Sequence, residues 1–235
     1  MFNQGNTLTS FRGPWGVRVE VDQSILFLGG FLVYMSLDSG PIDGLIFALI
    51  IGVSIYLHEL GHAWGCLVQG VPVRRVVLHG GGGFCEHARS PDRRQQELIV
   101  AMGPLVNLAL WALAGVALFL SDLMFLNRLA TNSAATTAYY EITYWLWLFG
   151  WVNLALFIFN LIPVQPLDGG KLLHLALLRV LPGTLAQRTT GAIGLILSLL
   201  WIPAAIYVYL TQGWILFFIP SPRAHYNMMR GNLAF

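Results

Sequence analysis

The feature that most constrains the fold of this chain is a series of long apolar segments separated by short polar stretches. The segments lie at about residues 24–38, 42–68, 97–120, 139–162 and 191–210, and an apolar element at 212–220 adds a sixth if it also crosses. About 20 apolar residues in a helix span a bilayer with every backbone polar group paired. The first segment is short and spans only with its flanks. We therefore predict an all-α polytopic membrane protein, a single domain over residues 1–235 with five to six transmembrane helices.

Composition supports the membrane assignment and excludes other classes. The chain is 56% hydrophobic and 10% charged, whereas soluble proteins have about 25% charged residues. A net charge of +2 is too small to indicate nucleic acid as a partner. Two cysteines, Cys66 and Cys85, give no disulfide framework. The lipid bilayer is thus the first expected partner, and the sequence indicates no oligomeric state.

The second apolar segment ends in a motif with metal-binding spacing, Leu57-His58-Glu59-Leu60-Gly61-His62. On a helix, residues four apart lie on one face one turn apart, so two neutral imidazoles can share one Zn²⁺ ion. Glu59 then lies beside the metal without ligating it, where it can take a proton from water as a general base. The preceding stretch, residues 44–56, carries no charge. The metal motif therefore lies at the end of a membrane segment.

A catalytic zinc site needs a third protein ligand, and acidic residues are scarce enough to search by position. Asp168 is the only acidic residue after Glu141. It follows the 139–162 span, at the same expected membrane level as the histidines, within an irregular stretch rich in proline and glycine. Such backbone is tolerated at membrane depth only inside protein or beside a wet cavity. We predict Asp168 as the ligand; the alternatives are that it only caps the helix at 169–181, or that Glu86 is the ligand.

Basic residues predict the orientation of the chain in the membrane. They gather in two connecting segments, 69–96 and 163–190, where they are Arg74, Arg75, Arg89, Arg93, Arg94, Lys171, Arg179 and Arg188. We expect both segments and the N-terminus on the cytosolic side of a prokaryotic cell membrane, with the active site towards the cytosol. The basic C-terminal tail lies on the cytosolic side as well only if a sixth element crosses the membrane.

These motifs together resemble the site-2 protease family of intramembrane zinc metalloproteases. The resemblance rests on His58-Glu59-Leu60-Gly61-His62, on Asn160…Pro163…Leu167-Asp168-Gly169-Gly170, and on Gly103-Pro104-Leu105-Val106-Asn107, and it covers about residues 42–173. It implies a three-helix catalytic core and one zinc ion with the aspartate as third ligand. The implied substrates are transmembrane proteins cut in or near their membrane segments. The chain lacks room for PDZ or CBS domains, so we expect a compact member.

Other residues near the motifs have two interpretations each. Val71–Leu78 is rich in valine and predicts a strand, and the resemblance implies a small membrane-associated β element there. The run Gly80–Gly83 then either forms a plain flexible loop or exposes a backbone edge for the substrate, with Gly81 and Gly82 as the candidate contacts. Asn107 and Asn160 either bind substrate or an oxyanion, or tie helices together. The remaining assignments are structural: Cys66 as a small buried residue, Ser90-Pro91 as a helix start, and His79, His87, His174 and His225 as loop or surface residues.

The main alternative function is a non-proteolytic membrane metal-binding protein or a transporter. Transport through a bilayer uses ionisable side chains along a path inside the spans. Apart from Glu59, the predicted span interiors hold no acid at depth. The sequence therefore favours regulated proteolysis within the membrane over transport.

Overall fold

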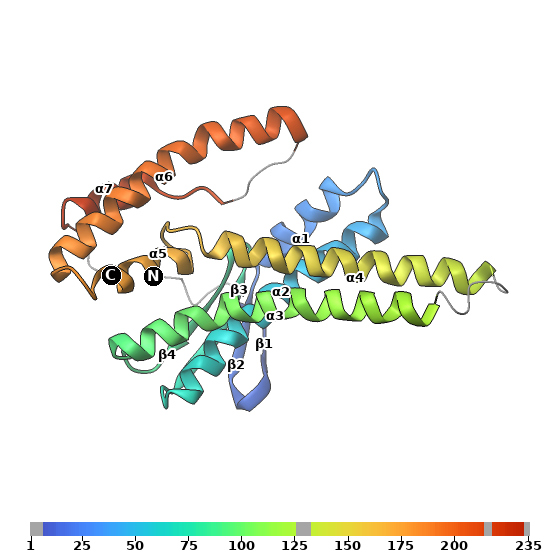
Figure 1. The fold of residues 1–235 in the computed structure, drawn as a ribbon, viewed down its shortest axis with the longest axis horizontal. Coiled ribbons are helices and arrows are strands. Elements are labelled where there is room, and N and C mark those ends of the chain that lie inside the picture. Colours follow the sequence, from blue (N-terminus) through green and yellow to red (C-terminus); the bar gives the residue numbers. More distant parts are fainter. Residues whose placement is uncertain (1–6, 126–132, 214–217, 233–235) are drawn as a thin grey trace. The chain divides into compact units, whose positions relative to one another are not determined.

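The computed structural model describes residues 7–125, 133–213 and 218–232 (Figure 1). Two compact units make up the chain: residues 1–89 with 102–157, and residues 90–101 with 158–235. In chain order the elements are β1 Thr7–Arg12, the 3-10 turn η1 Pro14–Gly16, β2 Arg18–Asp22, α1 Ser24–Met35, α2 Pro41–Val68, β3 Val73–His79, β4 Gly82–His87, α3 Arg93–Phe125, α4 Ser133–Asn160, α5 Asp168–Leu177, α6 Gly183–Gln212 and α7 Pro222–Met229.

Among the described residues, four helices are long and apolar enough to cross a membrane. They are Pro41–Val68, Arg93–Met124, Thr136–Asn160 and Gly183–Gln212, which confirms four of the predicted segments. The first predicted segment, 24–38, forms α1, a helix of 12 residues that is about 18 Å long. It is shorter than the hydrocarbon core of about 30 Å, because the chain turns after Met35 and Pro41 begins the next helix. Of the predicted element at 212–220, residues 214–217 lie outside the described part of the chain.

A four-stranded sheet in the first unit is larger than the β element predicted from sequence. Its order is β1-β2-β3-β4, with β2 and β3 parallel and the two outer pairs antiparallel. The strand predicted at 71–78 is β3, whereas β1 and β2 were not predicted. The chain leaves the sheet at β2, passes through α1 and α2, and returns to it at β3. A core of Val17, Val19, Ala63, Val76 and Leu78 packs the sheet against α2.

Three helices of the first unit meet around buried polar side chains. Ser54 on α2, Asn107 on α3 and Asn153 on α4 are all fully buried and hydrogen-bonded to one another, with Asn153 Nδ2 donating to Ser54 Oγ at 3.0 Å. Helices α2 and α3 approach closely at Gly61, where an added Cβ would lie 2.7 Å from the Met102 carbonyl oxygen. The predicted three-helix core is therefore α2, α3 and α4.

The second unit contains the start of α3, the end of α4, and α5 to α7. Helix α3 begins at Arg93, so the prediction that Ser90 caps it is wrong by two residues. Asp92 is the cap: its Oδ1 accepts from the Gln95 N–H at 2.9 Å, and its own N–H donates to Gln95 Oε1 at 3.0 Å. This reciprocal pair satisfies the two backbone N–H groups of Asp92 and Gln95 at the helix start. Arg93 also donates to the Leu178 carbonyl at 2.9 Å, which ties the helix start to the end of α5.

Candidate metal centre

The two motif histidines lie on one face of α2 with their ring nitrogens together. His58 Nε2 and His62 Nε2 are 3.1 Å apart, and both residues are buried. Two nitrogen ligands of a tetrahedral zinc, each 2.0–2.1 Å from the metal, are about 3.3 Å apart. The predicted helical spacing therefore gives a pair of donors at the separation that one metal ion needs.

A hydrogen bond to the other ring nitrogen sets the tautomer of His58. Asn107 Oδ1 lies 2.6 Å from His58 Nδ1; because this oxygen can only accept, Nδ1 carries the proton. The lone pair is then on Nε2, the nitrogen that faces His62, which is the arrangement that outer hydrogen bonds usually impose on histidine ligands. Asn107 Nδ2 in turn donates to Asn153 Oδ1 at 2.8 Å. Its side chain thus ties helices together, while the predicted role of Asn107 towards substrate or an oxyanion stays a prediction.

Sequence reasoning missed the far end of this hydrogen-bond network. Asn153 donates to Ser54 Oγ and also to the Phe149 carbonyl at 2.9 Å. The available signal was an amide inside an apolar span, which is costly in lipid unless it is paired. Asn153 and Ser54 therefore hold Asn107, which holds His58.

The absence of a side chain at Gly103 leaves room for a metal ion. A Cβ on Gly103 would lie 2.3 Å from His62 Nε2 and 2.6 Å from His58 Nε2. These distances are close to a zinc–nitrogen bond length, so the methyl group would take the space that a shared ion needs. The donors and the space beside them both fit a zinc ion.

Glu59 lies under the β3–β4 hairpin. Its side chain is buried, and a Cβ on Gly83 would lie 2.6 Å from Glu59 Cγ and 2.9 Å from Glu59 Oε1. Only a glycine lets β4 pass this close to the candidate base. Gly82 has φ +126°, a backbone conformation that favours glycine, and Gly81 is exposed in the turn. Of this run, Gly83 was not among the predicted site residues.

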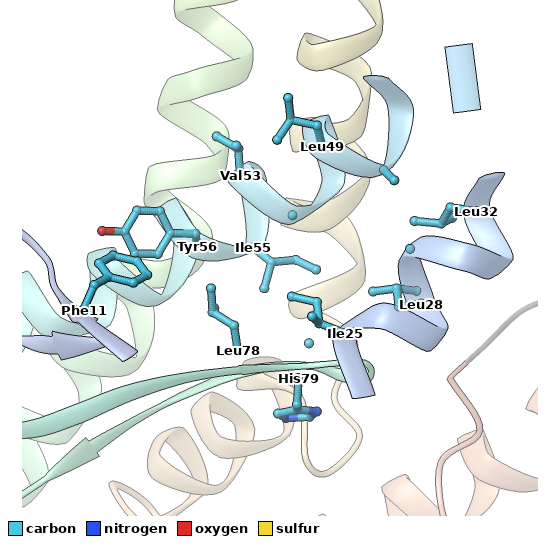
Figure 2. A pocket seen from close by; sticks show the side chains of 14 residues that line it. Phe11, Ile25, Leu28, Leu32, Leu49, Val53, Ile55, Tyr56, Leu78 and His79 are labelled. Carbon is cyan, nitrogen blue, oxygen red and sulfur yellow. The ribbon is translucent and has the colours of Figure 1, made fainter. Parts of the chain in front are cut away.

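An apolar cavity of about 290 Å³ lies in the first unit between α1, α2 and the sheet (Figure 2). Ile55 and Tyr56 line it and stand four and three residues before Glu59, so they share its face of α2. Gly82 lines the cavity next to Gly83. His79 lies at its floor, where burial lowers the pKa of the imidazole and the Asp22 carboxylate opposes that shift. The candidate base is therefore one helical turn from residues that line an apolar cavity.

Glu86, the rival for the third ligand, is held by arginines. Its carboxylate lies 2.6 Å from Arg75 Nε and 2.8 Å from Arg74 Nη1. These guanidinium groups hold the pKa of Glu86 below its usual range. Arg75 also binds Glu20 on β2 at 2.7 Å, so Glu86 belongs to an ion-pair network that links three strands.

Asp168 and Asn160 belong to the second unit. Asp168 is buried and is the first residue of α5, where Leu167 occupies the cap position without a side-chain cap bond. Asp168 therefore stands one residue inside the helix and not at the cap position. Lys171 Nζ lies 3.2 Å from Asp168 Oδ1. Asn160, half-buried, is the last residue of α4.

Comparisons with known proteins agree on one family. The model of peptidase family M50 matches residues 46–202. Stage IV sporulation protein FB of Bacillus subtilis is 30% identical over 193 residues, which cover 78% of this chain and 58% of that protein. A zinc metalloprotease of Methanocaldococcus jannaschii is 28% identical over 159 residues, covering 68% of this chain and 42% of the relative. The chain thus spans about half the length of these curated relatives.

A solved structure shares the fold. The site-2 protease from Methanocaldococcus jannaschii superposes with a TM-score of 0.62 at 22% identity, covering 95% of this chain and 93% of that one. The chain therefore shares the fold of that protein.

Proposed function

Because the chain belongs to peptidase family M50, we propose that it is an intramembrane zinc metalloprotease that hydrolyses peptide bonds in or near transmembrane segments of membrane proteins. The family membership bears out the resemblance to site-2 proteases and does not favour the transporter alternative. One observation supports this function most: two Nε2 atoms 3.1 Å apart face Gly103, with a buried glutamate beside them. This set provides metal donors, room for the ion and a base within one helical turn.

The cofactor is one zinc ion, and we propose that His58, His62 and Asp168 hold it. The histidines supply two neutral nitrogens, and Asp168 supplies the carboxylate that a three-ligand catalytic site requires. Three observations support Asp168: it is buried, it is not used as a helix cap, and it lies within the family match. Glu86 is committed to Arg74 and Arg75, which argues against the rival assignment.

Zinc, when bound, supplies a Lewis acid that eases deprotonation of water and attack on a carbonyl. Glu59 takes the proton from the attacking water, so the oxygen can form its bond to the scissile carbonyl carbon. Glu59 then gives this proton to the amide nitrogen as the carbon–nitrogen bond breaks, and the products leave as a carboxylic acid and an amine, which ionise in water to a carboxylate and an ammonium group. Burial of Glu59 under Gly83 keeps the carboxylate beside the histidine pair during both transfers.

The edge of the sheet supplies a surface for an unwound substrate. Strand β4 is an outer strand, so one side of its backbone has no neighbouring strand within the sheet, and an extended peptide can add there. Gly81 and Gly82 lie where this edge begins, next to Gly83 over the base. A helical segment hides its carbonyls in intrahelical bonds, so we propose that the substrate unwinds to pair with β4. Asn107 and Asn160 remain candidates for substrate or oxyanion contact.

The location also follows as a proposal. The apolar helices and the family make the chain a multi-pass integral membrane protein. We propose that the active site faces the cytosol of a prokaryotic cell, because the basic connecting segments 69–96 and 163–190 favour that side. Water would then reach Glu59 from the cytosol.

The proposed function is tested with three variants of the purified full chain: Glu59→Gln, Asp168→Ala and Glu86→Ala. Glu59→Gln removes the base but no ligand, so it should keep stoichiometric zinc and lose at least about 100-fold in cleavage rate. Asp168→Ala should lose both zinc and cleavage. Glu86→Ala should keep both. Zinc content and cleavage of a co-expressed single-span substrate are measured on the same samples.

Two results would contradict the assignments. Cleavage near the wild-type rate by Glu59→Gln removes the general base from the mechanism. Loss of zinc from Glu86→Ala with retention by Asp168→Ala means that the carboxylate ligand was assigned to the wrong residue.

A further inference from the structure

His225 is the most completely buried histidine among the described residues of the second unit. It lies on α7 and is 1% exposed, so its prediction as a loop or surface residue is wrong. The sequence around it, Pro222-Arg223-Ala224-His225-Tyr226, is polar and short, which hid the burial. The polar atoms of a buried imidazole are normally hydrogen-bonded. The partners of His225 therefore show which elements the ring connects.

Both ring nitrogens of His225 are engaged with other elements. Nδ1 lies 2.8 Å from the Ser221 carbonyl oxygen, which can only accept, so Nδ1 carries the proton. Nε2 is therefore an acceptor, and the Gln165 N–H donates to it at 3.0 Å. Ser198 Oγ on α6 lies 3.1 Å from Nδ1 and donates to the Gly194 carbonyl at 2.6 Å. One neutral imidazole thus joins α6, α7 and the segment before α5.

Helix α6 is shaped to receive this ring. A Cβ on Gly194 would lie 2.0 Å from His225 Cδ2, and a Cβ on Gly191 would lie 2.3 Å from the Met229 backbone nitrogen. Any larger residue at these two positions would push α7 away from α6. The close approach places the His225 ring where it meets the Gln165 backbone.

The segment that His225 holds leads directly to Asp168. Gln165 precedes Asp168 by three residues and lies inside a turn that the Leu167 N–H closes by donating to the Val164 carbonyl at 2.9 Å. Gly170 packs tightly on the same turn, since a Cβ there would lie 2.7 Å from the Val164 carbonyl carbon and 2.9 Å from the Gln165 nitrogen. Gly169 packs on the end of α4 and the residues after it, since its Cβ would lie 2.2 Å from the Leu161 carbonyl oxygen. The path from the imidazole to the aspartate is therefore short and closely packed.

We propose that His225 is a positioning residue for Asp168: its Nε2 fixes the Gln165 backbone, and the turn transmits that constraint to the carboxylate. The inference rests on the proposed function, because it matters to catalysis only if Asp168 is a zinc ligand. Groups that orient a metal ligand from outside typically contribute about 10- to 100-fold to metal affinity. His225 acts on Asp168 indirectly, through the Gln165 backbone. We therefore expect it to contribute about tenfold to zinc affinity, the lower end of that range.

The test compares three variants of the full chain with wild type. His225→Leu removes the acceptor, and His225→Gln places an amide oxygen within reach of the Gln165 N–H. Met228→Ala is the matched control, because Met228 is also buried on α7 but has no bond to the Gln165 segment. Two quantities are measured: hydrogen exchange of the Gln165 amide, and zinc affinity by competition with a chelator.

We expect His225→Leu to speed exchange at Gln165 and to weaken zinc binding about tenfold. His225→Gln should recover most of both, and Met228→Ala should leave zinc affinity within about twofold of wild type. Faster exchange with unchanged zinc affinity overturns the positioning role. If Met228→Ala weakens zinc binding as much as His225→Leu does, and His225→Gln recovers none of the affinity, then His225 acts only through packing. That result also overturns the positioning role.

Asp168→Ala, measured in parallel, separates this inference from the proposed function. If that variant keeps its zinc, Asp168 is not a ligand, and the positioning role of His225 fails with that assignment. Hydrogen exchange at Gln165 does not depend on the ligand assignment and would still report the contact with His225. If Asp168→Ala loses zinc while His225→Leu does not, only the positioning role fails.

Discussion

At the residue scale, Gly103 is a position in the first unit where one added methyl group is expected to prevent zinc binding. It stands on α3 opposite both candidate ligand nitrogens, and a single added methyl group would lie within 2.6 Å of each. The helix itself would accept alanine readily, since alanine is the better helix former. The cost at this position therefore comes from the site and not from the backbone.

Gly103→Ala should contain much less than one zinc ion per protein and should cleave no substrate, because the methyl group occupies the space of the ion. Gly115→Ala is the control on the same helix, since a Cβ there meets nothing within 4 Å. It should keep full zinc content and gain about 0.5–1 kcal/mol of stability from helix propensity. Zinc analysis and thermal unfolding of both proteins give the comparison. Full zinc content in Gly103→Ala would mean that the ion lies elsewhere.

The residues that could be predicted from sequence are those whose chemistry depends on local spacing. His58 and His62 are four apart on one helix, so the spacing alone puts both rings on one face, where their Nε2 atoms lie 3.1 Å apart. Asn153 and His225 could not be assigned in this way. Their partners lie 46 and 60 residues away in the chain, and only the packing of helices shows which amide meets which ring.

At the scale of elements, buried amides determine how α2, α3 and α4 hold together. Asn107 bonds His58 on one side and Asn153 on the other, and Asn153 reaches Ser54. Hydrogen bonds between membrane helices contribute about 0.6 kcal/mol on average, so stability alone depends little on each bond. The orientation of His58 depends on them much more.

Asn107→Ala should weaken zinc binding about 10- to 100-fold, because His58 loses the acceptor that fixes its tautomer. Asn153→Ala should weaken it less, and the double variant should resemble Asn107→Ala alone, since Asn153 acts through Asn107. Thr143→Ala is the control on α4, because Thr143 Oγ1 bonds only its own helix backbone at the Tyr139 carbonyl and the Tyr140 carbonyl. Chelator competition measures all four. Additive losses in the double variant would contradict the chain of contacts.

Elements with a long, uniform signal were predictable, and short ones were not. Four apolar segments give the four long helices, with ends that differ by several residues because capping decides the boundary. Asp92, and not Ser90, starts α3, since Gln95 three residues later completes the pair. Strands β1 and β2 carry six and five residues. Their alternation is too short to distinguish from a polar loop until the partner strand is known.

At the scale of the whole molecule, the sheet constrains how the chain crosses the membrane. Strand β2 precedes α1 and strand β3 follows α2, yet the two are paired. Paired strands lie at one level, so the path through α1 and α2 must return to the side from which it began. This agrees with the basic residues of 69–96 and an N-terminus on the same side, as the proposed orientation requires.

Cysteine labelling checks this path. Cys85 packs against the sheet core and is a poor probe, so Cys66 and Cys85 are first replaced by alanine. Thr9→Cys on β1 and Ala88→Cys after β4 are exposed, as is Asp122→Cys near the far end of α3. An impermeant thiol reagent should miss the first two in intact cells and label them in inverted vesicles. Asp122→Cys should behave in the opposite way.

Labelling of Thr9→Cys and Ala88→Cys from opposite sides would contradict the pairing of β2 with β3. Labelling of both from outside intact cells would keep the sheet and reverse the orientation. The cut would then lie towards the other end of the substrate's membrane segment.

The pairing of β2 with β3 also has a consequence for synthesis, because α1 and α2 lie between these two strands in the chain. When β1 and β2 leave the ribosome, the strand that completes their sheet is still about 50 residues from being made, counting residues 23–72. Both helices between them, α1 and α2, are made before β3. Glu59 emerges with the second of these helices, and Gly83 covers it only after the hairpin has closed. Asp168 is translated later still. A nascent chain therefore has its two motif histidines and its candidate base before its substrate edge and its proposed third ligand are made. If Asp168 is the third ligand, we expect the chain to be inactive until that residue has been added.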